Sequence, residues 1–136
     1  MKEQKTLNPI STSDAPAAIG PYSQGVVVGN LLFVSGQLPI DPSTGEFVPG
    51  GIKEKTHQII RNLEAIAKAA NSDLSHVVKT TLFLTNIADY SSVNDVYAQY
   101  FFSTLPARAV VQVSGLPKNS EIEMEAIVCL ADYPNE

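Results

Sequence analysis

The chain has 136 residues, of which 44% are hydrophobic and 17% charged, so it fits one folded domain with a core and not a disordered chain. Its formal net charge of −5 argues against a surface that binds nucleic-acid phosphates. The single cysteine excludes an internal disulfide, and no apolar run is long enough for a signal peptide or a membrane span. We therefore expect a soluble cytoplasmic protein.

The N-terminal half predicts an arm, a hairpin, a loop and a helix. Residues 1–16 are polar and interrupted by prolines, which favours an extended arm. "SQGVVVGNLLFVSGQ" places two β-branched or apolar runs around Gly29 and Asn30, the pattern of a β-hairpin. "PIDPSTGEFVPGG" has proline and glycine at turn positions and predicts a loop. Between residues 52 and 70, apolar side chains recur at helical spacing.

The C-terminal half predicts a strand in "HVVKTTLFLT", a helix over residues 90–102 that must end before Pro106, and strands in "ARAVVQV" and "EIEMEAIVCL". This order of elements predicts a single α+β domain over residues 1–136, a two-layer sandwich in which two helices cover one face of a mixed sheet. The other face also carries apolar side chains, so we expect a closed homo-oligomer formed through the sheet. The alternative is that the short arm covers this face.

Arg108 is the one charged residue of "PARAVVQV". An unpaired guanidinium in a largely buried strand is costly, so a negative group is expected to meet it. That group is either a glutamate of the same protein or the carboxylate of a ligand, which a guanidinium binds in a two-pronged geometry. The strand alone leaves both readings open. Arg61, on the polar face of the first helix, is expected to be a solvated surface residue.

The last strand carries Glu121, Glu123 and Glu125 at alternate positions, so all three would share one face. In one reading, this face is exposed to solvent and salt screens the repulsion between the three carboxylates. In the other, one glutamate lines a site and transfers protons. Apolar residues continue the same face, so Glu123 and Glu125, rather than Glu121, are expected to be partly buried.

Cys129 is expected to be a small core residue. His57 and His76 have no partners at metal-ligand spacing, so no metal site is expected. The residues alone thus predict a small α+β oligomer with an arginine and glutamate pocket for a small carboxylate.

Two long stretches, "APAAIGPYSQGVVVGNLLFVSGQLPIDPSTGE" and "PARAVVQVSGLPKNSEIEMEA", resemble the RidA/YjgF family of reactive-intermediate deaminases. The resemblance implies a chorismate-mutase-like fold and a homotrimer with sites between its subunits. It implies the activity of a 2-iminobutanoate/2-iminopropanoate deaminase, which hydrolyses imines and enamines such as 2-aminoacrylate to 2-keto acids and ammonia and so protects pyridoxal-phosphate enzymes. Its partners would be 2-imino and 2-keto carboxylates, with no cofactor, nucleic acid or membrane.

By position, the resemblance implies that Arg108 binds the substrate carboxylate and that Glu123 transfers protons through a bound water. It implies further substrate contacts from Tyr22, Ser35, Gly36, Asn94 and Val110. Many members have cysteine where this chain has Val110. The resemblance implies that this residue acts mainly through its backbone carbonyl, which valine also has. The departure therefore affects thiol chemistry more than hydrolysis.

Two other classes of protein could use the same residues. A non-enzymatic binder of keto acids needs Arg108 but not Glu123. A structural trimer needs Arg108 only as half of an internal ion pair. A chorismate mutase is a weaker alternative, because its dianionic substrate would want more cationic groups than this chain offers near Arg108.

Overall fold

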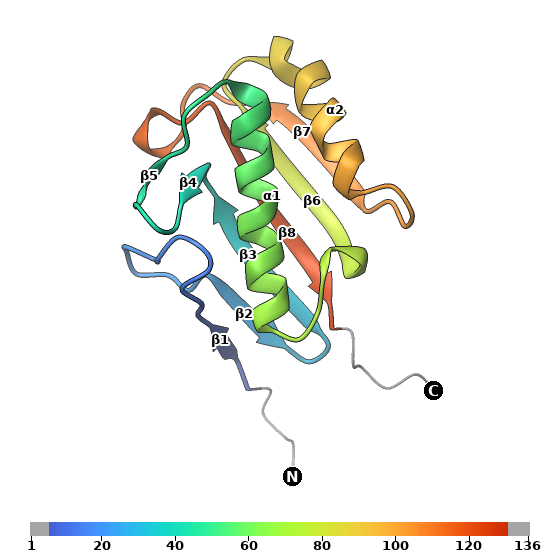
Figure 1. Ribbon diagram of the computed structural model, residues 1–136. Helices are drawn as coiled ribbons and strands as arrows, with labels where there is room; N and C mark the ends of the chain where they lie inside the picture. The colour runs from blue at the N-terminus through green and yellow to red at the C-terminus, as the bar shows by residue number, and fades with distance from the viewer. Residues whose placement is uncertain (1–5, 131–136) are drawn as a thin grey trace.

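The computed structural model describes residues 6–130 and places both α-helices of this range on one face of a β-sheet (Figure 1). Residues 1–5 of the expected arm, and residues 131–136, lie outside the described residues. The strands are β1 (Asn8–Ile10), β2 (Gly25–Val28), β3 (Leu31–Gln37), β4 (Ile40–Asp41), β5 (Glu46–Phe47), β6 (Val77–Leu84), β7 (Ala107–Gln112) and β8 (Ile122–Cys129). The helices are α1 (Ile52–Ala69) and α2 (Tyr90–Tyr100), with short 3-10 helices η1 (Leu74–His76), η2 (Ile87–Asp89) and η3 (Pro117–Asn119).

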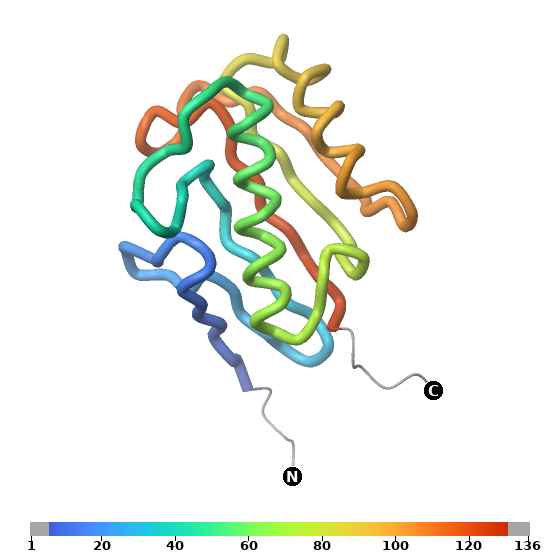
Figure 2. Tube along the Cα trace, in the orientation of Figure 1, coloured from blue at the N-terminus to red at the C-terminus, as the bar shows by residue number. Residues whose placement is uncertain are grey.

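Six strands form the main sheet in the order β1-β2-β3-β8-β6-β7. Strands β6 and β7 run parallel, because α2 carries the chain back between them (Figure 2). The other neighbouring strands are antiparallel. The two-layer α+β sandwich with a mixed sheet is therefore confirmed, whereas the trimer stays a prediction.

The core lies between α1, α2 and the sheet face that they cover. Helix α1 buries apolar residues one turn apart, and the sheet supplies alternate residues of β3, β6 and β8, as expected for periods of 3.6 and 2. Fully burying a side chain of this size contributes roughly 1.5–3 kcal/mol. The largest fully buried side chains include Ile59, Ile60, Leu63, Ile66, Leu32, Leu82, Leu84, Ile122, Met124 and Val128.

The second face of the sheet has no covering layer within residues 6–130. Along β8, even-numbered residues are buried under the helices, and odd-numbered residues are half-buried or exposed. Phe33 and Val111 on this face are 44% and 42% exposed. An apolar face of this kind fits the expected association through the sheet.

The arm does not cover that face. Residues 8–10 pair with β2 at the edge of the sheet, and Ala15 packs into the core on the helix side. The alternative in which the arm covers the second face is thus wrong for residues 6–16.

Two short pairings lie in segments expected to have no strand, namely β1 in the arm and the β4–β5 hairpin in the loop. Both are made by backbone hydrogen bonds in segments of two or three residues, which are too short for a side-chain pattern to show. Pro9 is tolerated in β1 because this strand lies at the sheet edge. No helix within residues 6–130 has the length and apolar character needed to cross a bilayer.

Candidate active site

A cavity of about 750 Å³ opens beside the end of β3 and the start of β8. Four of the predicted site residues line it, namely Tyr22, Ser35, Gly36 and Glu123. Apolar side chains from the loops before β2 and after β3 complete much of its wall, among them Ile19, Leu38, Ile40 and Pro42. The structure therefore brings together residues that are up to a hundred positions apart in the chain.

The carboxylate of Glu123 lies over Gly36 of the neighbouring strand. A Cβ atom on Gly36 would overlap Oε2 of Glu123 and lie 2.8 Å from its Cδ. Only glycine leaves room for the carboxylate in this position. Partial burial, and secondarily the charge of Glu125, raise the pKa of Glu123, because both disfavour its charged form. A carboxyl group with a raised pKa is suited to accept and return a proton.

Ser35 ties the Tyr22 loop to β3. Its hydroxyl donates to the carbonyl of Ser23 at 2.5 Å, and its backbone N–H donates to the carbonyl of Gln24 at 3.0 Å. The Tyr22 side chain is 53% exposed at the cavity rim. Buried Gln24 anchors the base of this loop, because its amide donates to the carbonyls of residues 12, 15 and 16.

The three glutamates do not form a single ladder. Glu121 precedes β8, and its carboxylate pairs with Lys55 on α1, so it leaves the face that the alternation predicts. Glu123 is half-buried, as expected, but Glu125 is exposed, so the expectation that it is partly buried is wrong. Both carboxylates line the cavity on the uncovered face, but burial differs because Glu123 lies against Gly36, whereas Glu125 lies further along β8, in register with Thr81.

Arg108 lies on β7, at the edge of the sheet, and its guanidinium is held by α2. Nη1 donates to Oδ1 of Asn94 at 2.7 Å, and Nη2 donates to the hydroxyl of Tyr90 at 2.9 Å. Its Cζ lies 4.8 Å from the ring centroid of Tyr97 and 5.6 Å from that of Tyr90, within the range of cation–π attraction. Among residues 6–130 it forms no ion pair. The internal Arg–Glu pair is therefore not seen in the described chain.

Arg108 and Glu123 lie on opposite faces of the sheet. Arg108 is in register with Thr80, whose hydroxyl is hydrogen-bonded to Tyr97 under α2. Glu123 is in register with Phe83, three positions further along β6 and therefore on the other face. Strands β7 and β8 are also separated by β6. Within a single chain, the predicted site residues therefore form two separate groups, called here the Glu123 half-site and the Arg108 half-site.

Asn94 and Val110 belong to the Arg108 half-site by position. Val110 shares the helix-side face of β7 and packs against the core. The sequence interpretation missed Tyr90 and Tyr97, because aromatic residues on a helix are most simply core residues. Their spacing from Asn94, four residues before and three after, was the available signal, since it places all three on one helix face.

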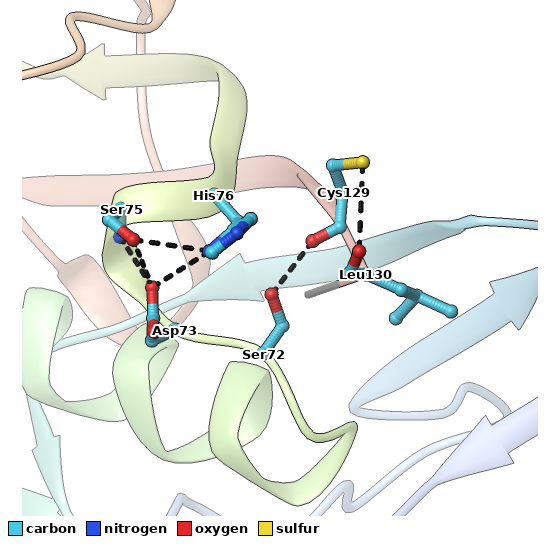
Figure 3. A network of polar contacts seen from close by, with 6 residues as sticks. All are labelled: Ser72, Asp73, Ser75, His76, Cys129 and Leu130. Atoms are coloured by element: carbon cyan, nitrogen blue, oxygen red, sulfur yellow. Dashed lines mark hydrogen bonds and ion pairs between the residues drawn. The ribbon is translucent and has the colours of Figure 1, made fainter. Parts of the chain in front are cut away.

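The remaining reactive side chains lie elsewhere. Figure 3 shows two separate sets of contacts: His76 with Asp73 and Ser75 at η1, and Cys129 with Ser72 and Leu130 at the end of β8. Nδ1 of His76 lies 3.0 Å from Asp73 and 3.1 Å from Ser75, so both partners meet the same ring nitrogen and no Ser-His-Asp relay forms. Cys129 is half-buried and lies outside the core cluster, so the expectation of a core residue is wrong. No three potential metal ligands group together within residues 6–130.

Arg61 and His57 lie on α1, away from both half-sites. Arg61 is exposed, as expected. His57 is half-buried and is hydrogen-bonded through Nδ1 to the hydroxyl of Tyr100 at 2.7 Å.

Comparison with known proteins supports the resemblance noted from the motifs. Residues 12–130 match the family model described as Endoribonuclease L-PSP. The chain is 53% identical to the RutC family protein y4sK of Sinorhizobium fredii, over 91% of this chain and 98% of that protein. It is 54% identical to the 2-iminobutanoate/2-iminopropanoate deaminase of Bos taurus, over 87% and 86% of the two chains.

A solved structure, E. coli TdcF with bound serine, superimposes with a TM-score of 0.87 at 40% identity and covers 91% of this chain and 99% of its own. The family model covers both stretches that carry the half-sites, and each of these relatives matches at least 87% of the chain. The chain therefore belongs to the Endoribonuclease L-PSP family, the RidA/YjgF family that its sequence resembles.

Proposed function

We propose that this protein hydrolyses small 2-imino carboxylates and their enamine tautomers, such as 2-iminobutanoate, 2-iminopropanoate and 2-aminoacrylate, to 2-keto acids and ammonia. One observation carries the proposal: neutral side chains hold the guanidinium of Arg108 in place, and they do not compensate its positive charge. The name of the Bos taurus relative and the serine bound to TdcF support a small carboxylate as the ligand.

The proposed site is composite and is formed between neighbouring copies in a homotrimer. Arg108 lies on edge strand β7, and the Glu123 cavity opens on the face that has no covering layer. Joining the two half-sites therefore requires a second copy of the chain. Arg108, Asn94 and Val110 of one protomer would meet Tyr22, Ser35, Gly36 and Glu123 of the next.

The reaction needs one positioned water and one proton carrier. Arg108 binds the substrate carboxylate in two-pronged geometry and fixes the imine carbon. Glu123 takes a proton from the water as the water oxygen bonds to that carbon, the electron pair of the C=N bond moves to nitrogen, and Glu123 passes the same proton to this nitrogen to give a neutral carbinolamine. Glu123 then takes the proton of the carbinolamine hydroxyl and gives it to the nitrogen as the C–N bond breaks. Ammonia leaves, the hydroxyl becomes the keto group, and Glu123 is again a carboxylate.

The other lining residues shape and close the pocket. Ser35 and Tyr22 orient the substrate at the cavity rim, and the backbone carbonyl of Val110 would contact the water or the leaving amine. Because the imine is already electrophilic, positioning together with acid–base help of about 10²–10⁴-fold is sufficient. By removing reactive imines, the protein would protect the pyridoxal-phosphate enzymes that release them. The name of the family model suggests RNA, but a net charge of −5 and two carboxylates in the cavity disfavour that substrate.

The first experiment couples the protein to a serine or threonine dehydratase and follows the release of 2-keto acid. Wild-type protein should accelerate the release, and Arg108→Ala should abolish the acceleration. Arg108→Lys should be poor as well, since an ammonium cannot make the two-pronged contact. Arg61→Ala, which removes an exposed arginine of α1, is the matched control and should behave as wild type. Full activity of Arg108→Ala would refute the assignment.

Glu123→Gln separates an enzyme from a keto-acid binder. If the protein is an enzyme, Glu123→Gln should lose turnover and keep its affinity for 2-oxobutanoate. If the protein is only a binder, the substitution should leave that affinity intact, and the wild type should show no turnover either. Turnover by the wild type and its loss in the variant therefore separate the two cases.

The composite site is tested by co-expressing Arg108→Ala and Glu123→Gln chains. Each mixed trimer regains one site with an intact Arg108 and Glu123, so random assembly of equal amounts should restore about a quarter of wild-type activity. No restoration would place the two residues in a site within one chain.

A further inference from the structure

Tyr90 is the first residue of α2 and lies beside the charged group of Arg108. Its hydroxyl accepts a hydrogen bond from Nη2 at 2.9 Å, and its ring centroid lies 5.6 Å from Cζ of Arg108. Asn94, one turn further along α2, accepts from Nη1 at 2.7 Å. Two neighbouring positions of one helix face therefore fix both terminal nitrogens of the guanidinium.

These contacts orient the cation and leave it free to bind an anion. A guanidinium has five N–H donors, and Tyr90 and Asn94 use one each, so enough remain for a two-pronged carboxylate contact. Both partners are neutral and leave the positive charge uncompensated. Arg108 has no acidic partner within residues 6–130 that would have to be displaced first.

We propose that Tyr90 is a positioning residue for the substrate carboxylate: its hydroxyl holds the Arg108 guanidinium in the orientation that receives the two carboxylate oxygens. This inference rests on the proposed function, since it assigns that carboxylate to Arg108. Tyr90 lies at an accessible position, with 39% of its surface exposed, so its hydroxyl contributes little to the core. Its role is thus distinct from that of Tyr97, which is buried under the same guanidinium.

The contact predicts a dependence on pH that a structural tyrosine would not show. Hydrogen bonding to Asn94, and then the charge of Arg108, lower the pKa of the Tyr90 phenol. Above that pKa, the phenolate is an internal anion that competes with the substrate for Arg108. The ionisable groups around it are Arg108 on β7, Tyr97 on α2 and Asp89 on η2. Affinity for a carboxylate should therefore fall as the solution becomes alkaline.

The test compares Tyr90→Phe with Tyr100→Phe in the full-length protein. Both changes remove one hydroxyl from α2, but that of Tyr100 is hydrogen-bonded to His57 at 2.7 Å and not to Arg108. Binding of 2-oxobutanoate is measured by calorimetric titration between neutral and alkaline pH, and steady-state rates by the dehydratase-coupled assay. Tyr90→Phe should raise Kd and KM by about three- to tenfold at neutral pH, with kcat changed by less than about twofold. It should also abolish the alkaline loss of affinity, whereas Tyr100→Phe should match wild type.

Several results would overturn the inference. The first is a Tyr90→Phe variant with wild-type affinity and an unchanged pH profile. The second is an equal loss of affinity in Tyr100→Phe. The third is a Tyr90→Phe variant in which kcat falls and KM is unchanged. Absence of 2-oxobutanoate binding by the wild type would overturn it too. If the wild type binds this keto acid and Tyr90→Phe weakens that binding, the inference stands, even where no imine hydrolysis is found and the proposed function fails.

Discussion

Replacing Gly36 with alanine should displace the proposed proton carrier without unfolding the protein. The added Cβ would lie 2.8 Å from Cδ of Glu123 and 3.2 Å from Cγ, whereas carbon atoms pack at about 3.5–4.0 Å. The Glu123 side chain must therefore move by about 1 Å. A displacement of that size at a reacting group reduces the rate by about 10²-fold, so kcat/KM should fall by about that factor.

The assay is the dehydratase-coupled release of 2-keto acid, combined with a thermal unfolding curve. Glu123 is only half-buried and can turn toward the cavity, so the melting temperature of Gly36→Ala should change little. Gly115→Ala is the matched control, because a Cβ at Gly115 meets no atom within 4 Å. Wild-type turnover by Gly36→Ala, with Gly115→Ala also active, would refute the placement of Glu123 in the reaction.

Two further substitutions test the electrostatics and the core. Glu125→Gln removes the second cause of the raised pKa of Glu123, so that pKa should fall and the acid limb of the rate profile should move to lower pH. An unmoved limb, measured between about pH 4 and 8, would contradict the coupling of the two carboxylates. Leu82→Ala opens a cavity beneath α1 and α2, since Leu82 is fully buried, and should reduce the free energy of unfolding in urea by about 2–5 kcal/mol. A loss below about 1 kcal/mol would show that the core closes around the gap.

The layer structure could be predicted because side-chain periodicity was strong in the long elements. Apolar side chains alternate with others along β8 and recur at helical spacing along α1. Each pattern identifies the type of element and the side that is buried. The edge strand β1 and the β4–β5 hairpin could not be predicted in this way. Strand β1 pairs with a segment distant from it in the sequence, and β4 and β5 are very short. Both pairings are made by backbone hydrogen bonds, so they leave no pattern in the side chains.

The site was predicted in part. Glu123 could be chosen from its neighbours through the resemblance, and the structure agrees that it is the half-buried carboxylate of the three. The contacts of Arg108 with Tyr90 and Tyr97 were not predicted, because a tyrosine that packs in a core and one that holds a guanidinium occupy the same helical positions, and spacing from Asn94 does not tell the two apart. Glu121 left the expected face because β8 begins one residue after it and Lys55 is in reach.

The sequence by itself determined the long elements, their two layers and the family, and it predicted the residue types of the proposed carboxylate site. Only the tertiary structure decided that Arg108 and Glu123 lie on opposite faces. In β8, apolar and acidic residues alternate, so the face of Glu123 follows from the pattern. In β7, both phases carry apolar residues, with Ala109 and Val111 in one and Val110 in the other, so the pattern does not say which face Arg108 takes. That face is set by the pairing of Thr80 with Arg108 and by the contacts of Tyr97 on α2 with both residues, and these are contacts between segments that local periodicity does not encode.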